Sequence, residues 1–155
     1  LIVGAAANHA ALREKGEHSQ YIHIATHGSF RQDNPMFSGI RLGDAYLNLY
    51  DLYQLKLEAD LVTLSGCSTG MNAVSPGDEL LGLIRGLLYA GARSLLLTLW
   101  DVHDQSTAAF MTRFYLRLAA GEPKARAVQS AMKDLRFEYP HPYFWAPFLL
   151  IGKSL

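Results

Sequence analysis

The sequence predicts an α/β fold, a three-layer sandwich in which a mostly parallel central sheet lies between helices. Three observations predict it. Short, continuous apolar runs have the length and composition of buried strands. Segments with helical periodicity separate these runs along the chain. The chain has 155 residues, of which 50% are hydrophobic and 18% charged, so we expect one domain with a sizeable core over residues 1–155.

The first half of the chain alternates between short helices and short strands. β-branched and aromatic residues indicate the strands, and Asp33-Asn34-Pro35 indicates a turn. In chain order, we expect a helix over Ala10–Lys15 that Gly16 ends, a strand over Tyr21–Ala25, a loop over Ser29–Ser38, a hairpin of Gly39–Leu42 and Ala45–Leu47, a helical turn over Leu49–Leu55 and a strand over Ala59–Leu64.

The second half contains longer helices with recognisable ends. Asp78 and Asp104 are expected as N-caps, Gly91 and Gly121 as helix stops, and Pro123 as the first position of a helix. The expected elements are a loop over Ser65–Gly77, a helix from Asp78 to about Ala90, a strand over Ser94–Leu99, a helix from Asp104 to Ala120, a helix from Pro123 to about Phe137 and a strand over Pro147–Ile151.

Composition argues against several classes of partner and site. The 14 Lys and Arg residues balance the 14 Asp and Glu residues, and a net charge of zero disfavours a nucleic-acid binder. The single cysteine cannot form an internal disulfide or a site built from several thiolates, and it fits a reducing cytoplasm. Arg85 and Arg93 interrupt the apolar stretch from Leu80 to Trp100, so we expect no membrane span.

Chemically active side chains follow two of the predicted strands. The first strand runs into Thr26-His27-Gly28, and the second runs into Ser65-Gly66-Cys67. In parallel sheets the carboxyl ends of strands form the binding edge. An imidazole beside a thiol favours the thiolate and can protonate a leaving group, so His27 and Cys67 are candidate catalytic residues. The backbone N–H groups of Gly28 and Cys67 are candidate oxyanion donors. The alternative is structural, because a lone cysteine often acts as a small buried apolar side chain.

A second motif overlaps the first. Gly66-Cys67-Ser68-Thr69-Gly70 matches the G-x-S-x-G nucleophile elbow centred on Ser68, and Asp101 and His141 follow in the order found in α/β-hydrolases. An elbow requires a helix directly after the serine, whereas Pro76-Gly77 delays the next predicted helix. The chain is also short for that fold. We therefore disfavour a serine hydrolase.

With these residues in view, the sequence resembles the CHAT domain, a caspase- and separase-like family of cysteine peptidases. The matching segments occur in the family's order, and as a set they are specific. They are Ile22-His23-Ile24-Ala25-Thr26-His27-Gly28, Leu61 to Gly70, Gly77 to Leu83, Ala90 to Ser94, Leu99-Trp100-Asp101-Val102, Phe114-Tyr115-Leu116, and His141 to Phe148 followed by Gly152.

The resemblance implies a caspase-like sandwich with a dyad of His27 and Cys67. It also implies oxyanion donors at Gly28 and Cys67, substrate contacts at Ser65, Trp100 and Asp101, and neither metal nor organic cofactor. In this view Asp101 selects a basic side chain of a protein or peptide substrate. The competing view is that Asp101 and Asp104 cap the helix that follows them.

One departure from the family concerns length. Family domains are usually longer and begin with strands that are missing here, so we expect the C-terminal portion of a larger protein, with Leu1–Gly4 as the tail of one such strand. The His27 strand would then have an exposed edge, which favours self-association. Family members commonly carry helical repeats that receive partners. The remaining alternative is a catalytically silent scaffold or interaction domain.

Overall fold

A central four-stranded sheet organises the fold. The computed structural model describes residues 1–29, 38–65 and 78–155. The sheet has the strand order β1-β5-β6-β7 and contains β1 (Tyr21–Ala25), β5 (Leu61–Ser65), β6 (Ser94–Thr98) and β7 (Phe148–Gly152). β1, β5 and β6 run parallel to one another, and β7 is antiparallel to β6. The predicted α/β class with a mostly parallel sheet is confirmed.

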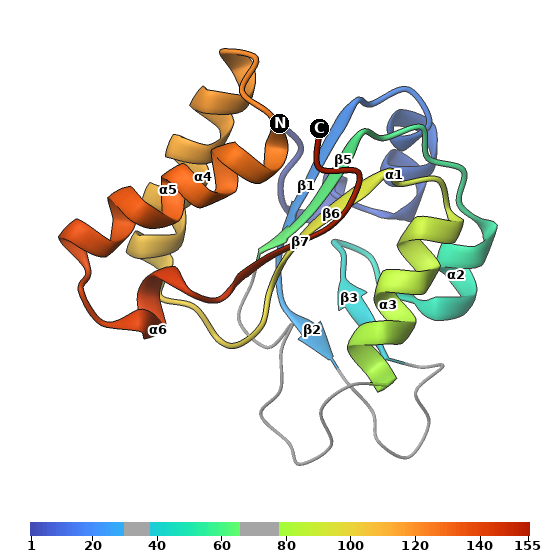
Figure 1. The fold of residues 1–155 in the computed structure, drawn as a ribbon. Helices are drawn as coiled ribbons and strands as arrows, with labels where there is room; N and C mark the ends of the chain where they lie inside the picture. The colour runs from blue at the N-terminus through green and yellow to red at the C-terminus, as the bar shows by residue number, and fades with distance from the viewer. Residues whose placement is uncertain (30–37, 66–77) are drawn as a thin grey trace.

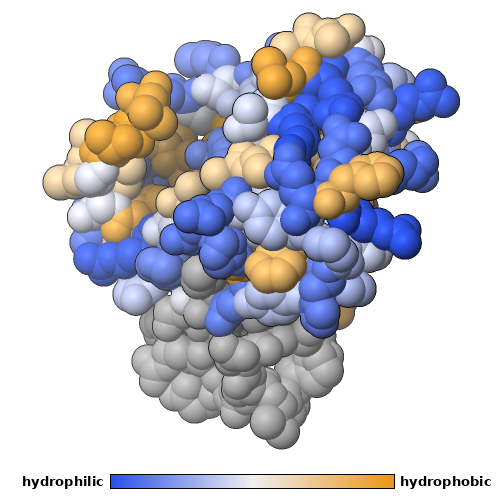
Figure 2. Space-filling model, turned by 90° about the vertical axis from the view of Figure 1, so that its left-hand side faces the viewer, coloured by the Kyte–Doolittle hydropathy of each residue, from blue (hydrophilic) through white to orange (hydrophobic). Residues whose placement is uncertain are grey.

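Helices cover both faces of this sheet. One face carries α1 (His9–Gly16), α2 (Leu49–Gln54) and α3 (Asp78–Tyr89), and the other carries α4 (Asp104–Ala119), α5 (Lys124–Glu138) and α6 (Pro142–Trp145) (Figure 1). Each layer buries its own apolar cluster against the sheet. The outer surface on the α4 and α5 side is mainly hydrophilic, with separated hydrophobic spots (Figure 2). These helices are therefore amphipathic, as their periodicity predicted.

A second, smaller sheet follows directly after β1. It contains β2 (Gly28–Ser29), β3 (Gly39–Arg41) and β4 (Tyr46–Asn48), all antiparallel. β3 and β4 form the predicted hairpin. β2 was not predicted, because two residues carry no periodicity and the strand forms only by pairing with β3. The larger parts of the two predicted loops, residues 30–37 and 66–77, lie outside the described residues.

The structure corrects the prediction at the N-terminus. Leu1–Val3 form no strand, and a 3₁₀ turn, η1 (Gly4–Ala6), follows them. Gly4 has φ of 59°, a left-handed conformation that turns the chain away from the extended path of Val3. A predicted strand tail over Leu1–Gly4 is therefore wrong for the described chain.

Several predicted helix starts shift by one residue, and one helix was missed. α1 begins at His9 and not at Ala10, and Asp78 is the first residue of α3 and not its N-cap. His103 is the N-cap of α4, and Asp104 lies in the first turn, where its charge favours the helix dipole. Pro123 is the N-cap of α5 and not its first helical residue. α6 is a short helix that His141 caps by accepting a hydrogen bond from the Tyr143 N–H.

A buried ion pair ties α5 to the start of β5. Lys124 is only 3% exposed, and its Nζ lies 2.8 Å from Oδ2 of Asp60, the residue before β5. Ser94, at the start of β6, donates a hydrogen bond to the Asp60 carbonyl. A buried ammonium without a partner costs several kcal/mol, so this pair fixes where α5 meets the amino ends of the strands.

Gly91 ends α3 as predicted and permits a close crossing of two chain segments. Its φ is 109°, and a Cβ built there would lie 1.9 Å from the carbonyl oxygen of Leu57. The neighbouring Ala90 carbonyl accepts a hydrogen bond from the Leu57 N–H. The segment that leads into β5 therefore passes against the end of α3 at a distance that only glycine allows.

We expect Gly91→Ala to destabilise the fold more than Gly121→Ala. Both positions have a left-handed backbone, which costs an L-residue about 1–2 kcal/mol, but a Cβ at Gly121 meets no atom within 4 Å. Overpacking adds about 1–3 kcal/mol at Gly91 alone. Urea unfolding of the two variants measures the difference, and equal losses would contradict the crowding at Leu57.

Candidate functional site

The candidate site lies where β1 and β5 end side by side. In the parallel register Ala25 pairs with Ser65, the last residue of each strand. One residue later, the Thr26 N–H donates to the Ser65 carbonyl oxygen at 3.2 Å. The two strands therefore end at the same level, about one strand spacing of 4.8 Å apart.

His27 follows β1 on an exposed part of the chain. Its carbonyl oxygen accepts a hydrogen bond of 2.9 Å from the Arg41 N–H, and the Thr26 hydroxyl donates to the Arg41 carbonyl at 2.8 Å. Both bonds anchor the chain around the imidazole to β3. His27 is therefore carried by a fixed main chain between the two sheets.

Gly28 belongs to β2 and directs its N–H away from β3. Hydrogen-bonded and non-hydrogen-bonded pairs alternate along an antiparallel ladder. Arg41 bonds to His27, so the next pair, Gly28 with Ile40, is of the non-bonded kind. The Gly28 N–H consequently points toward the side of β2 opposite β3.

Cys67, the other member of the predicted dyad, lies outside the described residues, as do Ser68 and the rest of the segment Gly66–Gly70. The described chain on this side ends at Ser65, which is 7% exposed. The Ser65 Oγ forms a hydrogen bond of 2.6 Å with Nε2 of His23. The predicted substrate contact thus has its hydroxyl engaged within the protein.

His23 is a residue of this site that the sequence analysis did not select. It lies in the middle of β1, and its ring is 5.6 Å from the Tyr115 ring of α4. The Tyr115 hydroxyl donates to Thr63 Oγ1 at 2.8 Å. Partial burial lowers the pKa of His23 below its ordinary value of 6.5 and raises that of Tyr115. The sequence signal that could have identified His23 is its position as the one charged or strongly polar side chain in the run Tyr-Ile-His-Ile-Ala.

The segment after β6 rests on α6. Trp100 is half-buried and donates from Nε1 to the Tyr143 carbonyl at 3.0 Å. His103 makes an edge-to-face contact with Phe144, with ring centroids 5.7 Å apart. Asp101 lies between them along the chain and is half-buried. β6 neighbours β5, so both predicted substrate contacts follow the strand next to the one that leads toward Cys67.

His141, the histidine of the rejected serine triad, has a local role in the structure. Its Nδ1 accepts a hydrogen bond of 3.2 Å from the Tyr143 N–H and caps α6. That capping bond accounts for this residue without a catalytic task.

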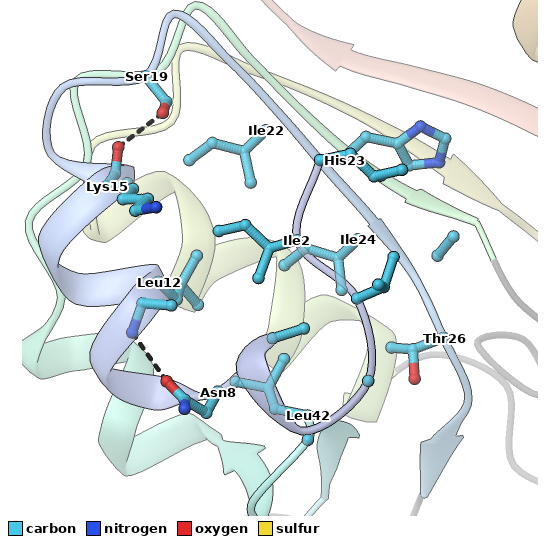
Figure 3. A pocket seen from close by; sticks show the side chains of 18 of the residues that line it. Ile2, Asn8, Leu12, Lys15, Ser19, Ile22, His23, Ile24, Thr26 and Leu42 are labelled. Carbon is cyan, nitrogen blue, oxygen red and sulfur yellow. Dashed lines mark hydrogen bonds between the residues drawn. The ribbon is translucent and has the colours of Figure 1, made fainter.

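A cavity of about 770 Å³ lies on the other face of β1, next to α1 and the first residues of the chain. The ring of His23 points away from it, toward the other face of the strand (Figure 3). Apolar side chains at this cavity include Ile2, Leu12, Ile22, Ile24 and Leu42. β1 therefore separates an apolar cavity from the polar contacts around Ser65.

The described chain contains neither a cluster of metal ligands nor a helix that could span a membrane. Among the residues that the structure describes, no three His, Cys, Asp or Glu side chains gather closely enough to hold a metal ion. Within the same residues, no helix has the length and apolar character needed to cross a bilayer.

We expect His23 to make the fold sensitive to acid. Its native pKa lies below that of the unfolded chain, so below about pH 6.5 the unfolded chain binds a proton that the native state does not. Stability is thus lost as the pH falls from 6.5 through the native pKa. Between about pH 7.5 and about pH 5, thermal unfolding should shift less for His23→Gln than for the unchanged protein. His18→Gln, at a histidine outside β1 that does not bond to Ser65, is the control and should retain the full shift.

The comparisons with known proteins agree with this architecture. Residues 1–153 match the CHAT domain. Tetratricopeptide repeat protein 28 of Homo sapiens and its counterpart in Mus musculus are each 34% identical to this chain over 116 residues, or 74% of it. The chain spans only 5% of the length of these curated relatives. Because this match covers nearly the whole chain and the sheet is caspase-like, the chain belongs to the CHAT domain family.

Proposed function

We propose that this domain is a cysteine-type endopeptidase that hydrolyses peptide bonds of protein substrates through His27 and Cys67. The observation that carries the proposal is the register of β1 and β5. Each residue of the pair follows its strand by two positions, and the last residues of the strands, Ala25 and Ser65, are direct neighbours. Two groups at equivalent positions after adjacent parallel strands emerge close together at the binding edge.

In the proposed reaction, His27 assists formation of the Cys67 thiolate, which attacks the carbonyl carbon of the scissile bond. The oxyanion is stabilised by the backbone N–H groups of Gly28 and Cys67. The Gly28 N–H points away from β3, which supports its proposed role as an oxyanion donor. His27 then protonates the leaving amine, and water hydrolyses the thioester to release the acid and restore the thiol. The reaction requires no metal or organic cofactor.

Substrate recognition is proposed for the strand ends that flank the dyad. Trp100 and Asp101 follow β6, and their segment is held by α6 through the bond from Trp100 to Tyr143. The carboxylate of Asp101 would favour a basic side chain before the scissile bond. Ser65 was predicted to contact substrate directly, but its burial and its bond to His23 favour an indirect role.

Regulation by a helical-repeat region is the second part of the proposal. The relatives at 34% identity are named as tetratricopeptide repeat proteins, and this chain covers only a small part of them. We propose that the chain is the C-terminal portion of a longer cytoplasmic protein, in which such repeats receive a partner. The alternative is a silent scaffold that uses the same fold for binding alone.

Covalent labelling distinguishes these possibilities. We expect a panel of peptidyl acyloxymethyl ketones to label the full-length parent at Cys67. Cys67→Ala should abolish the labelling, while Ser68→Ala, its neighbouring control, should retain it. Peptide hydrolysis should fall by several orders of magnitude for either Cys67→Ala or His27→Ala, because the two side chains act as a unit.

The other outcomes are equally informative. Labelling that only Ser68→Ala removes would favour the nucleophile elbow. No labelling by any probe, even with the full-length parent and its partner present, would favour the scaffold.

Self-association through β1 is a further expectation. β1 is at the edge of the four-stranded sheet. The Gln20 carbonyl and the Thr26 N–H both face β5, so the main-chain groups of Tyr21, His23 and Ala25 face the open side. Such an edge can pair with a second copy. Sedimentation should detect dimers at high concentration that Ala25→Pro removes, and a monomer at all concentrations would contradict the idea.

A further inference from the structure

We propose that His23 is a positioning residue that orients the chain leading to Cys67 through its hydrogen bond to Ser65. The inference deepens the proposed peptidase function and rests on it. His23 acts through Ser65, two residues before Cys67 in the sequence.

Ser65 is bonded both to β1 and to the residue that directly follows β1. Its side chain meets Nε2 of His23 at 2.6 Å, and its carbonyl oxygen accepts the Thr26 N–H at 3.2 Å. Thr26 directly precedes His27. The last residue of β5 is therefore fastened, by side chain and by main chain, to the strand that carries the proposed catalytic histidine.

The imidazole of His23 is itself in contact with α4. The Tyr115 ring of α4 packs against it at 5.6 Å, with an angle of 30° between the ring planes. Tyr115 in turn donates its hydroxyl to Thr63, two residues before Ser65 on the same face of β5. A hydrogen bond fixes an angle only when its donor and acceptor are both held, and here α4 holds the imidazole.

Ser65 offers little to a substrate, because it is only 7% exposed and its hydroxyl is bonded to His23. If Ser65 only filled the core, an apolar side chain would stabilise the fold better, because a buried hydroxyl without a hydrogen-bond partner lowers stability. The pair of His23 and Ser65 instead places a directional hydrogen bond at the end of β5.

The test uses the single cysteine of this chain. Alkylation by iodoacetamide reports Cys67 alone, and the pH at which its rate is half-maximal reports the thiol pKa. We expect a midpoint below the free value of about 8.5 in the unchanged protein. His23→Leu and Ser65→Ala should each raise it by about one unit, which slows alkylation at neutral pH about tenfold. The double variant should be no slower than either single one.

Two further variants separate positioning from stability. His23→Gln retains a hydrogen-bonding group near the position of Nε2 and should restore the midpoint. Tyr115→Phe removes the neighbouring bond to Thr63, should lower the unfolding temperature and should leave the midpoint within a few tenths of a unit. Ser65→Ala keeps the test valid if His23→Leu does not fold.

Two results would overturn the inference. One is a thiol midpoint that His23→Leu and Ser65→Ala leave unchanged. The other is an equal change in Tyr115→Phe, because the effect would then follow stability. Failure of the peptidase proposal is distinguishable, because it appears as absent ketone labelling of the unchanged parent, whatever the alkylation midpoints of the variants.

Discussion

The parallel pairing of β1 with β5 is the constraint on which the candidate site depends. Because Ala25 lies beside Ser65, the two strands end at one level and side by side in the sheet. A slip of one residue in the pairing of β1 with β5 would turn each side chain of β1 to the opposite face of the sheet. His23 would then face the apolar cavity, and Ile24 would face the hydroxyl of Ser65. The chemistry at the edge therefore depends on a register set several residues earlier in both strands.

Packing on both faces of β5 sets that register. Val62 and Leu64 belong to the apolar cluster that α2 and α3 help to form, while Leu61 belongs to the cluster of α4 and α5. On the latter side Phe110 stacks on Phe148, with centroids 3.5 Å apart, and so joins α4 to β7. A strand buried between two clusters cannot slide without exposing apolar surface on one face and burying mismatched volume on the other.

Sequence patterns predicted the parts of this molecule that are local. The strands and the longer helices appeared as apolar runs with capping or stop residues, as at Gly91 and Gly121. β2 was missed because it forms only against β3, and α6 was missed because its four residues are supported by contacts with Trp100 and His103. The bond between His23 and Ser65 joins residues 42 positions apart, so no local pattern contains it. His27 was predicted because it follows a strand and precedes a glycine. His23 and Ser65 lie in segments that resemble the family, but only their contact in the fold indicates a shared role.

The side of β5 that faces α4 changes character along its length. Leu61 packs among apolar side chains, Thr63 bonds to Tyr115, and Ser65 bonds to His23. Apolar packing stabilises without fixing an angle and tolerates substitutions of similar volume. A hydrogen bond specifies distance and direction, but it costs the desolvation of the groups that it buries. The strand thus contributes stability through Leu61, where it enters the core, and directional hydrogen bonds through Thr63 and Ser65, toward its end.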